Sequence, residues 1–273
     1  ALRRVLMKIW MAVWGIVSTL AYGGSTEFIP LQQRAQGHSL TGASLLNDSI
    51  FANPASSAFT NAYAVDGSFR TPKNFAVSIL DTKTSGMGGA LAYFRMNRPG
   101  IENVVQGAKI GMSGRVSENF GFGVMGKTVW GPDLAGTNAK YTDLDLGVVA
   151  QFEVFQLGLS MQNVLGGNPA MGEAREYSFG TRLNWEQTVF FSAAMNGGIQ
   201  NFQPQQFGFG AEYVSPYYFS LKGGYRFRPQ EQKSYWSAGL SILSPRMSIH
   251  YAVELPNVVG AVPEHSVGTT FLF

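Results

Sequence analysis

The segment from Tyr141 to Leu165 reads YTDLDLGVVAQFEVFQLGLSMQNVL. Apolar residues occupy alternate positions in both of its halves, and most positions between them are polar or glycine. This alternation is the pattern of a β-strand that has one apolar and one polar face. The halves meet at Phe152 and Glu153, where only a tight turn fits. The stretch therefore predicts an antiparallel hairpin.

The same alternating unit recurs along most of the chain. We expect fourteen strands, in the ranges 59–70, 74–82, 87–96, 104–116, 118–129, 141–151, 154–164, 175–184, 187–197, 206–214, 217–227, 233–242, 246–254 and 265–273. A tilted strand needs about 9–11 residues to cross a bilayer, whereas strands of soluble proteins usually have about 5–6. A soluble sandwich also alternates, but the lengths found here favour strands that span a membrane.

The connections between the expected strands alternate in length as well. Those after even-numbered strands are short, as at Ser117, and those after odd-numbered strands are longer, as at 130–140 and 255–264; the first hairpin, at 71–73, departs from this rule. Short turns at one end and longer loops at the other are typical of bacterial outer-membrane barrels. The predicted fold class is all-β: a transmembrane antiparallel β-barrel of about 14 strands over residues 58–273.

The composition agrees with a surface that faces something other than water. Only 14% of the 273 residues are charged, whereas 33 are glycine and 20 phenylalanine, and a typical soluble domain has about 25% charged residues. The net charge of +3, without runs of lysine or arginine, gives no support for a nucleic-acid partner. Cysteine is absent and the three histidines lack metal-ligand spacing, so we expect no metal and no cofactor.

The N-terminal residues read as a targeting segment. Arg3, Arg4 and Lys8 precede a short apolar run, 9–20, which ends at small residues near Gly23. A basic head, a short apolar core and a small-residue exit predict a secretory signal peptide over residues 1–23. A membrane anchor is the alternative, but the run is short for a span. Export combined with many amphipathic strands points to the bacterial outer membrane.

Residues 24–57 lack the strand pattern. From Gly37 they read GHSLTGASLLNDSIFANPASSAF, with a possible short helix at 43–46 and the tripeptide Asn53-Pro54-Ala55. A turn ahead of a strand would use the same tripeptide. Its position, after a signal peptide and before a series of strands, gives it weight. Here the chain resembles FadL-like outer-membrane proteins, including their PorV-type branch, through Gly42-Ala43, Asp48 and the N-P-A tripeptide.

This resemblance implies that residues 24–57 form a plug or hatch with Asp48, Asn53, Pro54 and Ala55 as its motif. It also implies one of two functions. The first is a channel for passive uptake of hydrophobic or other small solutes. The second is a structural barrel that binds protein partners at the outer membrane. The apolar loops at 130–140 and 165–174 suit a ligand mouth, yet every loop is short for a dedicated transporter.

The polar phase of the strands carries charges of both signs, which we expect to face the lumen. These residues are Lys109, Arg115, Lys127, Asp143, Asp145, Arg182, Glu212, Lys222, Arg226, His250 and Glu254. The carboxylates of Asp143 and Asp145 allow a cation site, but pairing with nearby lysine or arginine is the simpler interpretation. Glycines in the same phase leave room beside the charges or let the sheet curve. His250 lies near no nucleophile motif, and we do not expect an enzyme.

The last strand, HSVGTTFLF, ends with Phe271 and Phe273 in one phase. A terminal phenylalanine on an amphipathic strand resembles the signal read by the barrel assembly machinery, although an ordinary last strand can end the same way. The expected partners are therefore outer-membrane lipid, that machinery, and a hydrophobic ligand or a protein partner.

Overall fold

The computed structural model describes residues 28–71, 73–97, 104–199, 202–258 and 260–273. The predicted signal peptide, 1–23, and the first residues of the predicted plug, 24–27, lie outside them. Among the described residues, no helix has the length and apolar character needed to cross a bilayer.

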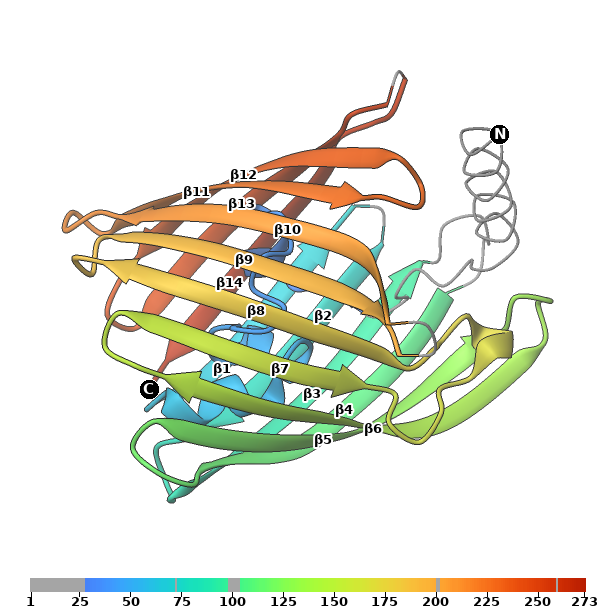
Figure 1. Ribbon diagram of the computed structural model, residues 1–273, viewed down its shortest axis with the longest axis horizontal. Helices are drawn as coiled ribbons and strands as arrows, with labels where there is room; N and C mark the ends of the chain where they lie inside the picture. Colours follow the sequence, from blue (N-terminus) through green and yellow to red (C-terminus); the bar gives the residue numbers. More distant parts are fainter. Residues whose placement is uncertain (1–27, 72, 98–103, 200–201, 259) are drawn as a thin grey trace, which may run out of the picture.

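Fourteen antiparallel strands form one closed barrel, in which β1 pairs with β14 (Figure 1). The strands are β1 (Tyr63–Arg70), β2 (Asn74–Asp81), β3 (Met87–Asn97), β4 (Val104–Arg115), β5 (Phe120–Pro132), β6 (Asn138–Gln151), β7 (Phe155–Gln162), β8 (Glu176–Trp185), β9 (Val189–Gly198), β10 (Gln203–Val214), β11 (Phe219–Arg228), β12 (Lys233–Leu243), β13 (Met247–Pro256) and β14 (Glu264–Leu272). The predicted fold class and strand number are confirmed.

The hairpin formed by β6 and β7 shows how the sequence pattern becomes the wall of the barrel. Leu146 and Val148 on β6 and Leu159 on β7 are exposed on the outside, whereas Asp145 and Gln156 point inward and are buried. An apolar exterior around a polar interior is the arrangement of a barrel that spans lipid. The strands close on themselves, so every ladder hydrogen bond is satisfied without a free edge.

The two ends of the barrel differ in their connections. Short turns and the C-terminus lie at one end, on the left in Figure 1, and the longer loops lie at the other. We call these the short-turn end and the long-loop end. β6 begins at Asn138, earlier than expected, because Asn138 pairs with Pro132 in an extended hairpin. β1 begins only at Tyr63, because the residues before it form a 3-10 helix.

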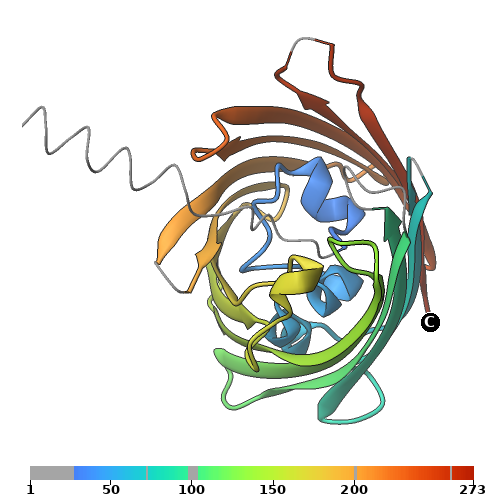
Figure 2. The same cartoon turned by 90° about the vertical axis from the view of Figure 1, so that its right-hand side faces the viewer.

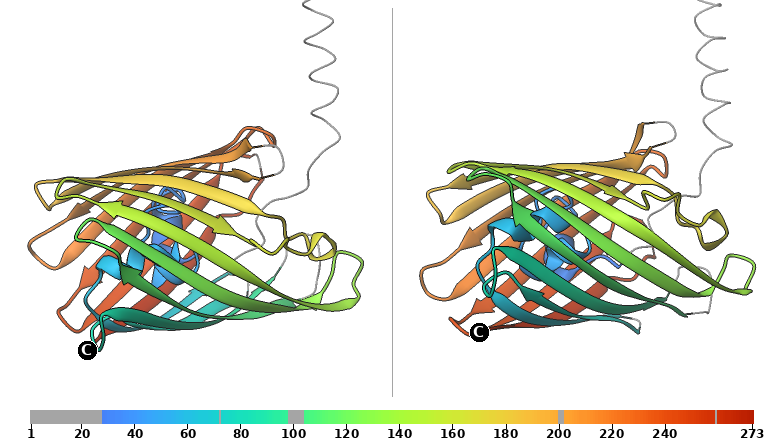
Figure 3. Two further views of the ribbon diagram at one scale, coloured as in Figure 1. Left: turned by 60° about the horizontal axis from the view of Figure 1, so that its bottom comes forward. Right: turned by 90° about the horizontal axis from the view of Figure 1, so that it is seen from below.

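Residues 28–59, which we call the internal segment, lie inside the barrel (Figure 2). They form α2 (Leu31–Ala35) and the 3-10 helices η1 (Leu46–Ile50) and η2 (Pro54–Phe59). α2 lies beside β11–β14, η1 beside β1–β3, and η2 beside β3–β7. Figure 3 shows the segment between the strands from two further sides. The prediction of a short helix at 43–46 is wrong. Only Leu46 of that range is helical, and the backbone of Gly42 and Ala43 lies against Gly180 of the barrel wall.

Candidate functional site in the barrel interior

The first group of lumen charges surrounds one carboxylate. Asp145 on β6 forms ion pairs with Lys109 on β4 and Lys127 on β5, each with a nitrogen–oxygen distance of 2.9 Å. These three side chains are almost fully buried. Asp143 has a different role, because its oxygens accept from the backbone N–H groups of Leu165 and Gly167, both at 2.8 Å. Asp143 therefore shapes the loop after β7, and the two carboxylates do not converge on one cation.

A second group joins the internal segment to the wall. Glu254 on β13 forms an ion pair with Arg226 on β11, lies 3.9 Å from the Arg34 guanidinium and 3.4 Å from His38 Nε2. Arg34 also pairs with Glu264 at 2.8 Å, and Arg70 of β1 lies 3.9 Å from the same carboxylate. The sequence indicated the strand residues of this group through their phase. It did not indicate Arg34 and His38, because the internal segment has no period that marks a face.

A third group lies along β8, β10 and β11. Glu212 contacts Arg182 at 3.3 Å and Lys222 at 3.1 Å, and it accepts a hydrogen bond from Gln36 of the internal segment at 3.3 Å. Arg115 differs from the other predicted lumen residues, since it is exposed at the short-turn end, where its Nε donates to Ala58 O at 2.9 Å. Arg115 thus lies at the mouth of the barrel.

His250 on β13 has two hydroxyl neighbours that the sequence did not reveal. Its Nδ1 lies 2.8 Å from Ser241 Oγ, to which Lys222 Nζ donates at 2.8 Å, and its Nε2 lies 3.3 Å from Thr270 Oγ1. Ser241 is 1% exposed, so this chain of hydrogen bonds is closed to a solute. Among the described residues, no group of three or more potential ligands is arranged to hold a metal ion.

Two ionisable groups of the internal segment are perturbed by the interior. Burial, reinforced by the negative charge of Asp66, raises the pKa of Asp48 well above its ordinary value. Burial, together with the positive charge of Arg226, lowers the pKa of His38 to about 3. Both groups therefore favour their uncharged forms while the segment occupies the barrel.

The Asn53-Pro54-Ala55 tripeptide begins η2 and also binds the wall. Asn53 Oδ1 accepts from Ala55 N at 3.1 Å, and Asn53 Nδ2 donates to Gly42 O at 2.7 Å and to Val148 O and Leu159 O at 3.3 and 3.4 Å. Asn168-Pro169-Ala170 starts the short helix η3 (Pro169–Met171) with the same 3.1 Å capping bond. The tripeptide is thus a local helix start, and the bonds to β6 and β7 set the first copy apart.

An apolar cluster lies among these polar groups. Its aromatic rings are Phe28 and Phe51 of the internal segment and Phe94 of β3, with centroids 5.2–6.3 Å apart. The cluster also contains Met125 of β5 and Met171 of η3, and these five side chains are buried together with six smaller or neighbouring apolar ones. η3 is held at the long-loop end by a 2.8 Å hydrogen bond from Leu134 N to Ala170 O. The sequence indicated only the apolar character of the two loops.

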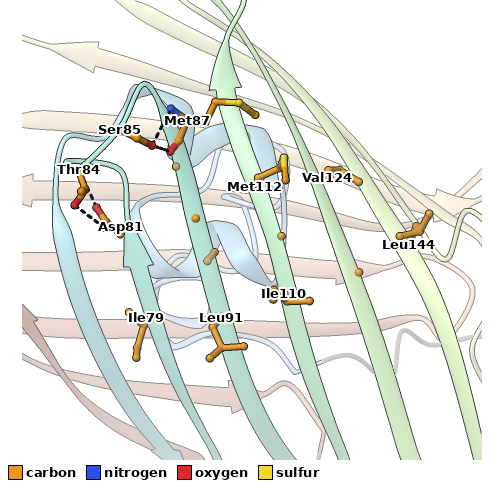
Figure 4. A pocket seen from close by; sticks show the side chains of 15 residues that line it. Ile79, Asp81, Thr84, Ser85, Met87, Leu91, Ile110, Met112, Val124 and Leu144 are labelled. Atoms are coloured by element: carbon orange, nitrogen blue, oxygen red, sulfur yellow. Dashed lines mark hydrogen bonds between the residues drawn. The ribbon is translucent and has the colours of Figure 1, made fainter.

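The outer wall carries a groove of about 860 Å³ across β2–β6 (Figure 4). Its sides are outward-facing apolar side chains such as Leu91, Ile110 and Leu144. Gly89 and Gly126 lie between these larger residues and lower the surface there. The groove opens on the apolar exterior, so it is separate from the interior groups.

No family model and no curated protein matches this chain. Several solved structures match it. The toluene transporter TbuX of Ralstonia pickettii is 14% identical, with 90% of this chain and 97% of that chain covered and a TM-score of 0.64. The Pseudomonas putida toluene transporter TodX is 12% identical, with 88% and 96% covered and a TM-score of 0.66. A Pseudomonas aeruginosa FadL homologue is 12% identical, with 90% and 99% covered and a TM-score of 0.60. The resemblance seen in the sequence is confirmed for the architecture: the chain has the FadL-like barrel fold.

Proposed function

We propose that this protein is an outer-membrane channel for the passive uptake of small hydrophobic solutes. The observation that carries the proposal is the apolar cluster of Phe28, Phe51, Phe94, Met125 and Met171 inside a lumen otherwise lined by paired charges. Two of its residues belong to the internal segment and one to a loop at the long-loop end. A solute that displaces Met171 would meet aromatic rings and a flexible thioether, which adapt to varied apolar shapes.

Two further observations support this proposal. TbuX and TodX, whose fold the chain shares, are described as toluene transporters. The lumen charges are paired with one another or with the internal segment, so they do not line a wide aqueous pore. A hydrophobic solute gains most from a path that avoids open water, because its apolar surface stays buried along the way.

The test is toluene flux into liposomes that contain the purified protein. The Phe94→Ala variant removes a buried ring of the cluster, and we expect slower flux or weaker toluene binding. Phe209→Ala is the matched control, because Phe209 is 53% exposed on the outer face of β10. Equal flux through all three proteins would contradict a solute site at the cluster, and an absence of flux in the unmodified protein would contradict the channel.

The internal segment is proposed to act as a hatch. Deleting residues 24–57 should raise the single-channel conductance in planar bilayers, since the segment occupies the interior. A single-channel conductance that stays unchanged after the deletion would count against this role.

A docking barrel of PorV type is the second candidate. It is favoured by exposed apolar side chains at the long-loop end, Leu134 at 57% and Leu165 at 62% exposure. Gentle purification separates the two functions. A stoichiometric protein partner that is lost in a Leu134→Ser/Leu165→Ser variant would favour docking, whereas a bound lipid-like molecule and no partner would favour transport.

A further inference from the structure

Glycines that face the lumen follow one another across the wall and meet the internal segment. We call this set the glycine belt; it comprises Gly123, Gly147, Gly158, Gly180, Gly208, Gly210, Gly224 and Gly239. A Cβ atom at Gly158 would lie 1.6 Å from Gly42 O, and one at Gly147 would lie 2.0 Å from Asn53 Oδ1. Only bare backbone leaves room for the segment at these positions.

The belt is continuous because its members are neighbours in the sheet. Gly123 pairs with Gly147, Gly158 with Gly180, and Gly210 with Gly224. The belt runs from β5 to β12, with Ala194 as its member on β9. Residues 35–43 and 53–55 lie against it, and Asn53 Nδ2 reaches the carbonyls of two of its strands. At most belt positions this contact is backbone against backbone, and at Gly147 and Gly239 it is with the side chains of Asn53 and Ala35.

The opposite wall makes a different contact. On β2 the inward positions carry side chains, such as Ser78 and Leu80, and η1 lies beside this strand. Asn47 Nδ2 donates to Ser78 Oγ at 2.9 Å. This side-chain contact involves no residue of the belt.

The exposure of the residues at its start sets η1 apart from the docked residues. Within residues 28–57 every side chain is buried except those of Ile29, Gln32, Leu45 and Leu46, which are half-buried. Two adjacent leucines at the start of η1 are therefore less buried than the residues that lie on the belt.

We propose that solutes pass between η1 and β1–β3, and that η1 moves while the residues on the glycine belt stay docked. This inference rests on the proposed channel function and deepens it. The half-buried leucines supply an apolar border for the path, and η1 meets β2 through a side-chain hydrogen bond rather than through close backbone contacts. In this proposal the residues on the glycine belt stay in place and only η1 moves, so the internal segment does not leave the barrel.

The chain has no cysteine, so engineered cysteine pairs can fix one part of the segment at a time. Ser39→Cys with Ser192→Cys, whose hydroxyl oxygens lie 2.5 Å apart, ties the segment to β9. Ser57→Cys with Ser113→Cys, 2.9 Å apart, ties η2 to β4. Asn47→Cys with Ser78→Cys ties η1 to β2. Toluene flux into liposomes is measured before and after reduction, and thiol labelling measures how much of each bridge has formed.

We expect the first two bridges to leave flux unchanged and the third to abolish it, with recovery on reduction. Loss of flux with the Ser39–Ser192 bridge would show that the belt must be vacated and would overturn the inference. Flux that persists through a fully formed Asn47–Ser78 bridge would overturn it as well. Both results leave the channel itself intact, whereas a cysteine-free protein without flux refutes the channel and the path together.

A glycine pair on one strand tests the belt without any bridge. A Cβ at Gly224 would lie 2.2 Å from the Gln36 carbonyl carbon, whereas one at neighbouring Gly223 meets nothing within 4 Å. We expect Gly224→Ala to make the internal segment accessible to protease in folded barrels and Gly223→Ala to leave it protected. Equal protection in both variants would contradict docking on the belt.

Discussion

Asp145 is a buried carboxylate that forms ion pairs with two lysines, so its substitution should strongly affect the stability of the barrel. We expect Asp145→Asn to lower the free energy of unfolding by about 3 kcal/mol, because Lys109 and Lys127 lose their shared counter-charge in a desolvated site. Urea titration of the folded band on unheated gels measures the change. Glu231→Gln is the control: Glu231 pairs with Arg228 and Lys233 in an exposed loop, where the cost should be about 0–1 kcal/mol.

Asp48 should make the position of η1 depend on pH. Its pKa is raised in the docked segment, so the undocked form releases its proton first as pH rises above the ordinary value of 3.8. Docking is therefore most favourable at acidic pH and weakens as pH rises towards the pKa of the docked form. Asp66 strengthens this effect and Lys222 opposes it. The rate of thiol labelling of an Asn47→Cys protein, divided by that of an exposed cysteine at the same pH, should rise with pH, and Asp48→Asn should remove the rise in this ratio.

Among individual residues, the sequence predicted the strand charges and a pairing between them, but not their partners in the internal segment. Lys109, Lys127 and Asp145 share one phase of alternating strands, which was enough to expect that they lie together. Glu254 was placed by the same phase, but its neighbours Arg34 and His38 come from a segment without periodicity. The sequence pattern suggests that the inward glycines leave room beside the charges or let the sheet curve. Their occurrence on successive strands was a signal for a chain lying against the wall.

At the level of the strand, the outer face of β7 should tolerate no charge. Leu159 faces outward near the middle of β7, so Leu159→Arg should lower the free energy of unfolding by about 2–4 kcal/mol. Leu165→Arg is the control, because Leu165 is in the loop beyond the strand and should lose little. Urea unfolding in lipid bilayers measures both, and equal losses would contradict the assignment of this face to lipid.

The strands were predictable as elements because their pattern is repeated, whereas the helices of the internal segment were not. η1 and η2 have five and six residues, too few to show a helical period or to be stable alone. Their positions follow from contacts with the wall, such as the bonds of Asn53 and Asn47, which a sequence does not display. The late start of β1 has the same origin, since η2 extends to Phe59.

The whole barrel should behave as a membrane protein during extraction and on gels. Its strands form a closed sheet, and apolar side chains from Ile79 to Phe271 are exposed on its outer face. We therefore expect that only detergent extracts the protein from membranes and that unheated samples migrate faster on gels. The closed wall explains the shift, because the folded barrel stays compact until heat opens it. A protein that is soluble without detergent would contradict this prediction.

The carboxylate of Glu264 has a mechanical consequence for the wall. It lies at the end of β14 beside Arg70, the last residue of β1, so it sits at the seam where the first and last strands join. Its shorter contact, however, is with Arg34 of the internal segment. A force that pulls β14 away from β1 must therefore break the contact between Glu264 and Arg34 of the internal segment as well as the hydrogen bonds between the two strands. A barrel emptied of that segment should unzip under a smaller load.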